Sequence, residues 1–130
     1  MPKVIGLGGL FFKSADTDAM REWYGRVLGL SFEDWGGTVF TPATAAAHPG
    51  AATVFSAFAA DTGYFAPSDA AFMFNLMVDD LDGMLARCAK HGVTPIKTTP
   101  DEGMGRFAHI MDNEGRKIEL WEPRAISSEV

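Results

Sequence analysis

The feature that most constrains the fold is a pattern of elements that occurs twice at constant spacing. Asp16 and Asp79 stand where an amphipathic helix is expected to begin, and Gly29 and Gly92 stand where it is expected to end. Both pairs are 63 residues apart (79 − 16 and 92 − 29). Short apolar runs typical of strands lie around each helix. Repetition at a fixed spacing indicates an internal duplication, in which each copy consists of a strand, a helix and three strands.

The first copy begins with the strand-like run "KVIGLGGLFFKS". Its helix carries a stripe of apolar residues at helical spacing, namely Met20, Trp23, Tyr24, Val27 and Leu28. The next strand-like runs are "LSFEDW", "GTVFTP" and "TVFSAFAA". In the second copy the run "FMFNLMV" precedes a helix capped by Asp79 or Asp80, and "VTPIKT", "RFAHIMD" and "KIELWE" follow it. We expect a single domain over residues 1–130, with module one at about 3–60, a linker at about 61–70, module two at about 71–123 and a short C-terminal tail.

Composition and charge exclude several classes of partner. The 130-residue chain has a formal net charge of −6 and no basic run, which argues against nucleic acid. Its longest apolar N-terminal stretch is about half a membrane span, so neither a membrane partner nor a signal peptide is expected. A single cysteine cannot form an internal disulfide, which suits a reducing compartment. We therefore expect a cytoplasmic protein.

Two such units would leave one face of each sheet without a helix to cover it. That face must either pack against the other unit or line a cavity between the units. In the run "KIELW", alternation along a strand directs Ile118 and Leu120 toward the helix. Lys117, Glu119 and Trp121 then point to the concave side. A glutamate inside an apolar strand is thereby explained as a cavity-facing side chain.

These motifs resemble a known family. The duplication, "WYGRVLGL" at the end of the first helix, "VDDLD" at the start of the second and "MDNEGRKIELWEP" near the end are similar to the glyoxalase/bleomycin-resistance/extradiol-dioxygenase superfamily, also called vicinal oxygen chelate proteins. The resemblance extends from about Val4 to Pro123. It implies an α+β fold in which two tandem βαβββ modules form an open, mixed, barrel-like sheet around a concave cavity, with the helices outside. It also implies a small-molecule ligand and a homodimer.

Many members of this family hold a divalent metal with one ligand from each of four strands, and most of these positions are changed here. Glu119 matches the last ligand, whereas Gly9 and Met73 stand where histidines are usual. The fourth position falls on "TVFSAFAA", where Thr53 and Ser56 are the oxygen donors. A zinc site generally needs at least three protein ligands, and a thioether suits hard cations poorly. We expect no metal and no other cofactor, unless the histidines supply an unusual metal geometry.

Glu119 and His109 are the candidate catalytic residues. If "DNEG" is the turn of the last hairpin, His109 falls nearly opposite Glu119. His109 either fills space with its hydrogen bonds satisfied or forms an acid–base pair with Glu119. Glu119 either forms a structural ion pair, with Arg106, Lys117 or His109, or faces a ligand. The candidate ligand-binding residues along the cavity are Gly9, Phe11, Ser56, Met73, Phe107 and Trp121.

Three functions remain open from the sequence. The first is a binder of a small, partly apolar molecule in a metal-free cavity. The second is a metal-independent isomerase or lyase that uses Glu119 with His109, and the third is a metal-dependent lyase or dioxygenase, against which the missing ligands argue. A non-catalytic interaction protein is a further alternative, because a fold alone does not imply an activity. The sequences of the loops at 42–52 and 61–71 do not indicate which ligand is bound.

Overall fold

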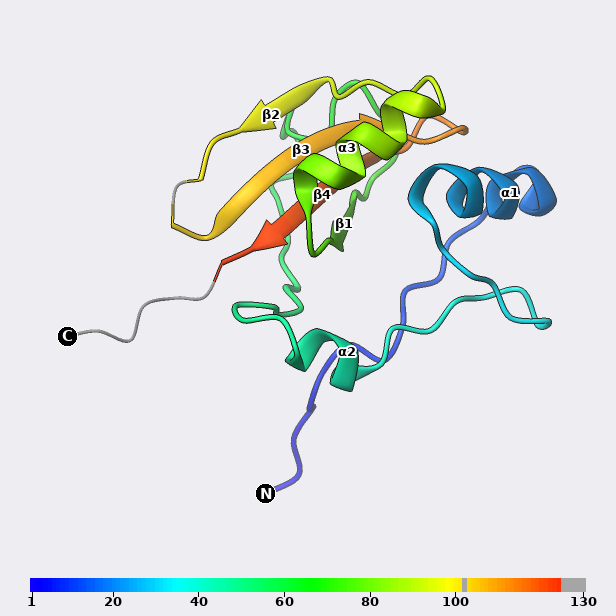
Figure 1. Ribbon diagram of the computed structural model, residues 1–130. Helices are drawn as coiled ribbons and strands as arrows, with labels where there is room; N and C mark the ends of the chain where they lie inside the picture. Colours follow the sequence, from blue (N-terminus) through cyan, green and yellow to red (C-terminus); the bar gives the residue numbers. More distant parts are fainter. Residues whose placement is uncertain (102, 125–130) are drawn as a thin grey trace.

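A computed structural model of the protein describes residues 1–101 and 103–124, so the predicted tail beyond residue 124 lies outside the described residues. Figure 1 shows a sheet with one helix across it, a second helix beside the first, and a long irregular N-terminal half. The elements are α1 (Thr17–Leu28), α2 (Pro42–Ala46), β1 (Phe74–Met77), α3 (Leu81–Lys90), β2 (Lys97–Thr99), β3 (Gly105–Met111) and β4 (Lys117–Pro123).

The strands form one mixed sheet in the order β1-β4-β3-β2. β1 runs parallel to β4, and the other neighbouring pairs are antiparallel. α3 connects β1 to β2 and lies across one face of the sheet (Figure 1). The predicted α+β class is confirmed, and the second half of the chain has the expected order of strand, helix and three strands. The sheet is open, with β1 and β2 at its edges.

Helices α1 and α3 begin and end close to where the sequence predicts. The side chains of Asp16 and Asp80 each accept a hydrogen bond of 3.0 Å from a backbone N–H of the first turn, so Asp80 rather than Asp79 is the cap. Gly29 and Gly92 follow the helices with φ of 77° and 78°. This left-handed conformation is favourable for glycine and stops a helix.

The core lies between α1, α3 and the helix-covered face of the sheet. The whole stripe predicted for the first helix is buried: Met20, Trp23, Tyr24, Val27 and Leu28. The sheet contributes Ile110, Ile118 and Leu120, which are completely buried, as the alternation in "KIELW" predicts for the last two. Full burial of such a side chain stabilises the fold by about 1.5–3 kcal/mol, so these contacts hold the helices against the sheet.

The first half of the chain differs from the expectation. None of the described residues before Phe74 forms a strand, although the apolar runs are there. Those runs form no part of the sheet (Figure 1), and many of their large side chains are exposed: Val4, Ile5, Phe11, Trp35, Val39, Phe40, Val54 and Phe55. A strand forms only where a neighbouring strand takes its backbone hydrogen bonds, and here no neighbour is in place. The arrangement as two tandem modules therefore stays a prediction.

Helix α1 is anchored to the sheet unit by hydrogen bonds at both α3 and the β3–β4 turn. Arg87 of α3 donates from Nε to the carbonyl oxygen of Val27 at 3.1 Å, and its guanidinium reaches two further carbonyl groups at the end of α1. Tyr24 donates from its hydroxyl group to Asp112, at the start of the β3–β4 turn, at 2.6 Å. In the described ranges 1–101 and 103–124, no helix has both the length and the apolar character needed to cross a bilayer.

Candidate ligand-binding site

A cluster of polar side chains surrounds Glu119 on the sheet face opposite α3. The strand register places His109 of β3 on one side of Glu119 and Asn75 of β1 on the other. His109 Nε2 lies 2.8 Å from Glu119 Oε2, and Asn75 Nδ2 donates to Oε1 at 2.8 Å. Tyr64, from the segment before β1, donates from its hydroxyl group to Oε2 at 2.5 Å. The predicted position of His109 opposite Glu119 on the last hairpin is thus confirmed.

The surroundings keep Glu119 charged and His109 neutral. Burial alone would raise the pKa of Glu119, but the hydrogen bonds from Tyr64, His109 and Asn75 outweigh it and hold that pKa below its ordinary value of 4.5. Burial lowers the pKa of His109 below 6.5 despite the neighbouring carboxylate, and the charge of Lys117 lowers it further. Burial and the hydrogen bond to Glu119 raise the pKa of Tyr64 to about 12. At neutral pH the cluster therefore consists of one carboxylate and neutral donors.

His109 has one ring nitrogen without a partner. Because Glu119 is an acceptor, the hydrogen bond between them assigns the proton of the neutral ring to Nε2. Nδ1 is then an acceptor, and among the described residues it is a buried side-chain atom with no hydrogen-bond partner. Buried polar atoms nearly always have a hydrogen-bond partner, so this acceptor is a position where the cluster can take one further hydrogen-bond donor.

Aromatic and methionine side chains continue the same face of the sheet. Phe107 and Trp121 stack with their ring centroids 5.9 Å apart and their planes 2° from parallel. The indole N–H of Trp121 donates to the carbonyl oxygen of Met104 at 2.8 Å, which fixes the ring. Met77 of β1 pairs in register with Trp121 and is 38% exposed. The face thus combines one carboxylate with a flat apolar wall, which suits a planar and partly apolar molecule.

Tyr64 was not predicted as a site residue. It lies in the turn-rich segment that runs up to β1, and its ring stacks on Phe58 with centroids 5.5 Å apart. Lys117 Nζ donates to the Tyr64 carbonyl oxygen at 2.6 Å, which holds the segment against the sheet. The sequence left open whether the two aromatic residues of this linker, Tyr64 and Phe65, fold over the cavity mouth or form a dimer contact, and it did not indicate Glu119 as a partner. Asn75 could have been found, because it is a polar residue inside an apolar strand just as Glu119 is.

The other candidate residues fall into two groups. Phe107 and Trp121 lie on the face with Glu119, and Met73 directly precedes β1. Gly9, Phe11 and Ser56 lie in the irregular segments of the first half, and all are exposed. No described contact joins these three to Glu119, because the strands that were to carry them are not assembled. Their role at the site stays a prediction.

Two of the cationic residues that the sequence suggests as ion-pair partners of Glu119 bind other groups. Arg106 forms a bidentate pair with Asp82 on the opposite face, with a shortest distance of 2.7 Å. Lys117 contacts the Tyr64 carbonyl group instead. Of the three cations considered from the sequence, only His109 bonds to Glu119 within the described chain, and it does so as a neutral group.

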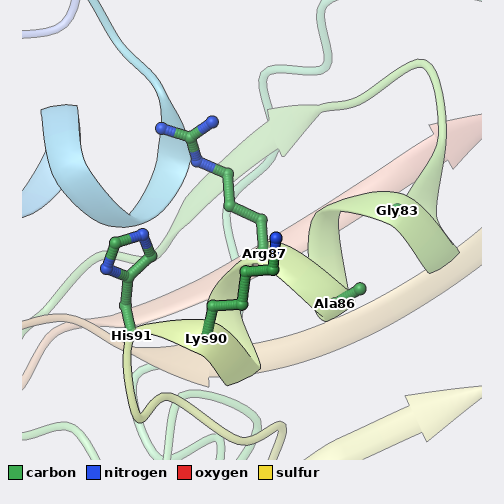
Figure 2. Close-up of a pocket in the computed structure, with 5 residues that line it drawn as sticks. All are labelled: Gly83, Ala86, Arg87, Lys90 and His91. Carbon is green, nitrogen blue, oxygen red and sulfur yellow. The ribbon is translucent and has the colours of Figure 1, made fainter.

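Two hollows of the surface lie away from this cluster. One of about 440 Å³ lies on α3 beside α1 and is lined by Gly83, Ala86, Arg87, Lys90 and His91 (Figure 2). Figure 2 shows the Arg87 side chain extended toward α1, whose carbonyl groups its guanidinium binds. Another of about 230 Å³ is lined by residues of the first half, including Phe11 and Met20. The chemistry is concentrated around Glu119 instead, where Tyr64 covers the sheet.

The donor set at Glu119 does not fit a metal ion. His109 and Glu119 are the two metal-ligating side chains of the cluster, and His109 is already hydrogen-bonded to the carboxylate through Nε2. Across residues 1–101 and 103–124, no three His, Cys, Asp or Glu side chains come together in a way that could hold an ion. A protein zinc site generally takes three or four such ligands.

Comparisons with known proteins agree with this fold. The sequence model of the family described as "Glyoxalase/Bleomycin resistance protein/Dioxygenase superfamily" matches residues 11–120. No curated protein matches the chain at a significant level. The crystal structure of TnmS3, an antibiotic binding protein from Streptomyces sp. CB03234, is similar with a TM-score of 0.50 and 18% identity, over 85% of this chain and 88% of that one.

The crystal structure of TioX from Micromonospora sp. ML1 is similar to the same degree. Its TM-score is 0.51 and its identity 15%, over 88% of this chain and 94% of that one. At such identities the two neighbours establish the fold alone.

Proposed function

The chain belongs to the glyoxalase/bleomycin resistance protein/dioxygenase superfamily, and we propose that as a member of it the protein binds a small, partly apolar molecule without a metal. The observation that carries this proposal is the sheet face around Glu119, where a carboxylate lies beside a stacked aromatic pair. The similarity to TnmS3, an antibiotic binding protein, supports a binding role on this fold.

The geometry favours binding over a merely structural role for Glu119. A structural carboxylate in a sheet would be expected to pair with a permanent cation, yet the donors here are two neutral side chains and an imidazole whose pKa is lowered. Both Asn75 and Tyr64 are exposed, so two of the three contacts can be reached from solvent. A ligand with a hydrogen-bond donor can therefore approach the carboxylate from the open edge at β1.

Binding is tested by calorimetric titration with planar aromatic probes, using adjacent threonines of β2 as a matched pair. Thr99 pairs in register with Phe107 on the site face, and Thr98 pairs with Ala108 on the helix face. We expect saturable binding of a naphthalene-type probe, with the probe recovered unchanged. Thr99→Asp should abolish binding because it places a charge beside the aromatic wall, and Thr98→Asp should not. Equal loss in both variants, or no saturation in the parent protein, would contradict the proposal.

A second candidate function rests on the contact of 2.8 Å between His109 Nε2 and Glu119 Oε2. A charged carboxylate can take a proton from a substrate as a general base and return it to the product, while the neutral imidazole donates to the carboxylate from Nε2 and orients it, as isomerase or lyase chemistry without a metal requires. This function predicts a bell-shaped dependence of rate on pH that disappears in Glu119→Gln. If every probe is recovered unchanged over the whole pH range, the catalytic function is contradicted and only the binding function remains.

The metal-dependent lyase or dioxygenase remains the least supported function, because Gly9 and Met73 supply no suitable ligand at two of the family's positions. A thermal-shift titration with zinc, nickel, manganese and iron(II) tests this directly. We expect no stabilisation that depends on Glu119. A stabilisation that is lost in both Glu119→Gln and His109→Phe would show that a metal binds there.

We also propose that the protein is a homodimer. The first half exposes its strand-like apolar runs, and the sheet has free edges at β1 and β2. Unpaired edges and exposed apolar runs are costly, and a second copy brings the same two features, so one two-fold contact can satisfy both chains.

We further propose a cytoplasmic location, which the single buried cysteine supports.

Light scattering after gel filtration tests the dimer. We expect twice the chain mass for the parent protein and the chain mass for Phe55→Asp, because Phe55 is 91% exposed in one of these runs. Met104→Asp, at an exposed apolar side chain of the second half, is the control that should remain dimeric. A parent protein of single-chain mass would refute the dimer.

A further inference from the structure

We propose that Tyr64 holds the place of the ligand's own hydroxyl group, so that the site takes a neutral, planar aromatic compound whose hydroxyl group replaces the Tyr64 phenol as a donor to Glu119. This inference rests on the proposed binding function and names its ligand class. It also assigns Tyr64 the role of a competitor that an incoming ligand must displace.

Of the three side chains that donate a hydrogen bond to Glu119, Tyr64 is the one that a ligand can displace. His109 and Asn75 are fixed on strands by the register of the sheet. Tyr64 lies in a segment without regular secondary structure, and its side chain reaches Glu119 across 55 residues of sequence. The residue is 36% exposed, whereas His109 is 1% exposed. Displacement of Tyr64 therefore requires movement of a surface segment and leaves the sheet unchanged.

A departing Tyr64 must be replaced by another donor. Oε2 of Glu119 accepts from Tyr64 and His109, and Oε1 accepts from Asn75. Without the phenol, a carboxylate that is 11% exposed keeps a single donor on Oε2. A buried charge that loses a hydrogen bond is strongly disfavoured, so an apolar ligand with no donor would displace Tyr64 at a net cost. The site therefore selects for a donor.

Charge excludes an anionic group from the place of the phenol. Lys117 Nζ lies 5.1 Å from the centroid of the Tyr64 ring and Lys97 Nζ lies 6.0 Å from it. An anion placed where the phenol lies would be repelled by the Glu119 carboxylate, whereas an ammonium group there would combine attraction to the carboxylate with repulsion from both lysines. A neutral hydroxyl group, like the phenol that it replaces, donates to the carboxylate without either repulsion. Its attached ring would keep the cation–π contacts with the lysines that the Tyr64 ring makes.

The contacts of the Tyr64 ring select an aromatic ligand. The ring stacks on Phe58 with planes 20° apart, and its edge-to-face contact with His109 has a centroid distance of 5.4 Å. A flat ring in the same position would make both contacts, and such contacts favour aromatic partners beyond the area that they bury. The stacked pair of Phe107 and Trp121 extends this surface along the sheet.

Two probes that differ by one hydrogen-bond donor test the inference. Calorimetric titrations would use 2-naphthol and 2-methoxynaphthalene with the parent protein and Tyr64→Phe, which keeps the ring but removes the competing donor. We expect 2-naphthol to bind Tyr64→Phe about tenfold more tightly than the parent protein, a factor typical of one hydrogen bond to a charged group. We expect 2-methoxynaphthalene, which must displace the same phenol, to gain as much from Tyr64→Phe and to bind both proteins about tenfold more weakly than 2-naphthol, because it offers Glu119 no donor.

Further variants separate the possible failures. In Glu119→Gln the preference for 2-naphthol over 2-methoxynaphthalene should shrink, because the charged acceptor is gone, and Tyr64→Ala repeats the test if Tyr64→Phe does not fold. Unchanged or weaker binding of 2-naphthol to Tyr64→Phe would overturn the role of Tyr64 while leaving the binding function standing. If neither probe binds any variant, the proposed binding function itself fails, and this inference fails with it.

Discussion

Two carboxylates of the β3–β4 hairpin, Asp112 and Glu119, are surrounded in similar ways but differ in the one feature that decides their use. Each accepts a hydrogen bond from a tyrosine of the first half of the chain, Tyr24 at 2.6 Å and Tyr64 at 2.5 Å. Each also contacts a basic side chain of the hairpin. For Asp112 that side chain is the guanidinium of Arg116, whereas for Glu119 it is the imidazole of His109.

The Asp112 cluster has every feature of a permanent structural joint. Its carboxylate is completely buried and accepts from Arg116 at 2.7 Å and from two backbone N–H groups of the turn. Arg116 also binds Glu114 and the carbonyl oxygen of Lys13. Burial and the hydrogen bond to Asp112 raise the pKa of Tyr24 far above its ordinary range, so the phenol stays protonated. The cluster ties α1 and the chain before it to the hairpin.

The Glu119 cluster lacks a permanent cation, and this difference shows which carboxylate a ligand can use. A guanidinium is charged at every accessible pH and binds a carboxylate with fixed geometry, so it cannot be exchanged for a ligand. Neutral donors at an exposed edge can be exchanged. Two carboxylates with similar contacts thus have different roles, and burial together with the charge of the donors distinguishes those roles.

The largest expected effect comes from breaking the Asp112 cluster. Arg116→Met keeps much of the side-chain volume but leaves Asp112 as an uncompensated buried charge. Removal of one partner from a buried ion pair typically costs about 3–5 kcal/mol of the free energy of unfolding. Urea denaturation followed by circular dichroism would measure it. A loss below about 1 kcal/mol would show that solvent reaches Asp112 and that the joint is not permanent.

A smaller effect is expected from the corresponding change at the other carboxylate. Glu119→Gln keeps an acceptor oxygen for Tyr64 or His109 and removes a charge that is mostly buried. We expect the free energy of unfolding to change by about 1 kcal/mol, while the preference for 2-naphthol over 2-methoxynaphthalene falls by about tenfold. Asp112→Asn is the matched control, because it should destabilise the fold more and leave the site face intact. The reverse ranking of the two variants would contradict the comparison.

The pH dependence of stability should also come from the Glu119 cluster. The pKa of His109 is lowered in the folded protein, so below its ordinary value of 6.5 the unfolded chain takes up a proton that the folded chain does not. Stability therefore falls as the pH falls through 6.5 toward the folded pKa. The lowered pKa of Glu119 adds a further loss below 4.5, as the carboxylate is protonated more readily in the unfolded chain.

Melting temperatures between pH 5 and pH 7.5 check the His109 contribution. His109→Gln, which keeps a donor for Glu119 but does not titrate, should flatten the decline over this range. His48→Gln, in the exposed loop after α2, should keep the decline of the parent protein. A decline of unchanged size in His109→Gln would mean that His109 is already accessible to protons in the folded state.

Helix α1 and much of the second half could be predicted from the sequence because their signals are local. Aspartate caps and glycines at the helix ends, together with the helical stripe, fix α1 and α3, and the "DNEG" turn fixes the register that places His109 opposite Glu119. The rest of the first half could be predicted less well. Its apolar runs have the composition of strands, but a strand also needs a neighbour, and the identity of that neighbour is not encoded in the run itself.

The contact between Tyr64 and Glu119 could not be predicted for a related reason. A linker without periodicity gives no register, so nothing specifies which atom of the sheet its side chain will meet. Asn75 is different, because its position in the middle of an apolar strand directs it to the same face as Glu119 once the parallel pairing with β4 is known. The sequence thus indicates the fixed donors on the strands and misses the exchangeable one.

The smallest expected effect tests whether Glu119 depends on any single neutral donor. Asn75→Ala removes the amide group that donates from Nδ2 to Glu119 Oε1 at 2.8 Å, at the exposed edge of the sheet. Water can take its place there, so we expect a loss of stability of about 1 kcal/mol or less and a rise in the Glu119 pKa, because one of the hydrogen bonds that lower it is gone. Carboxyl carbon chemical shifts followed by NMR during a pH titration would measure that pKa. If Asn75→Ala destabilises the fold as much as Arg116→Met does, the Glu119 cluster is as rigid as the Asp112 cluster, and its donors are no more exchangeable than a guanidinium.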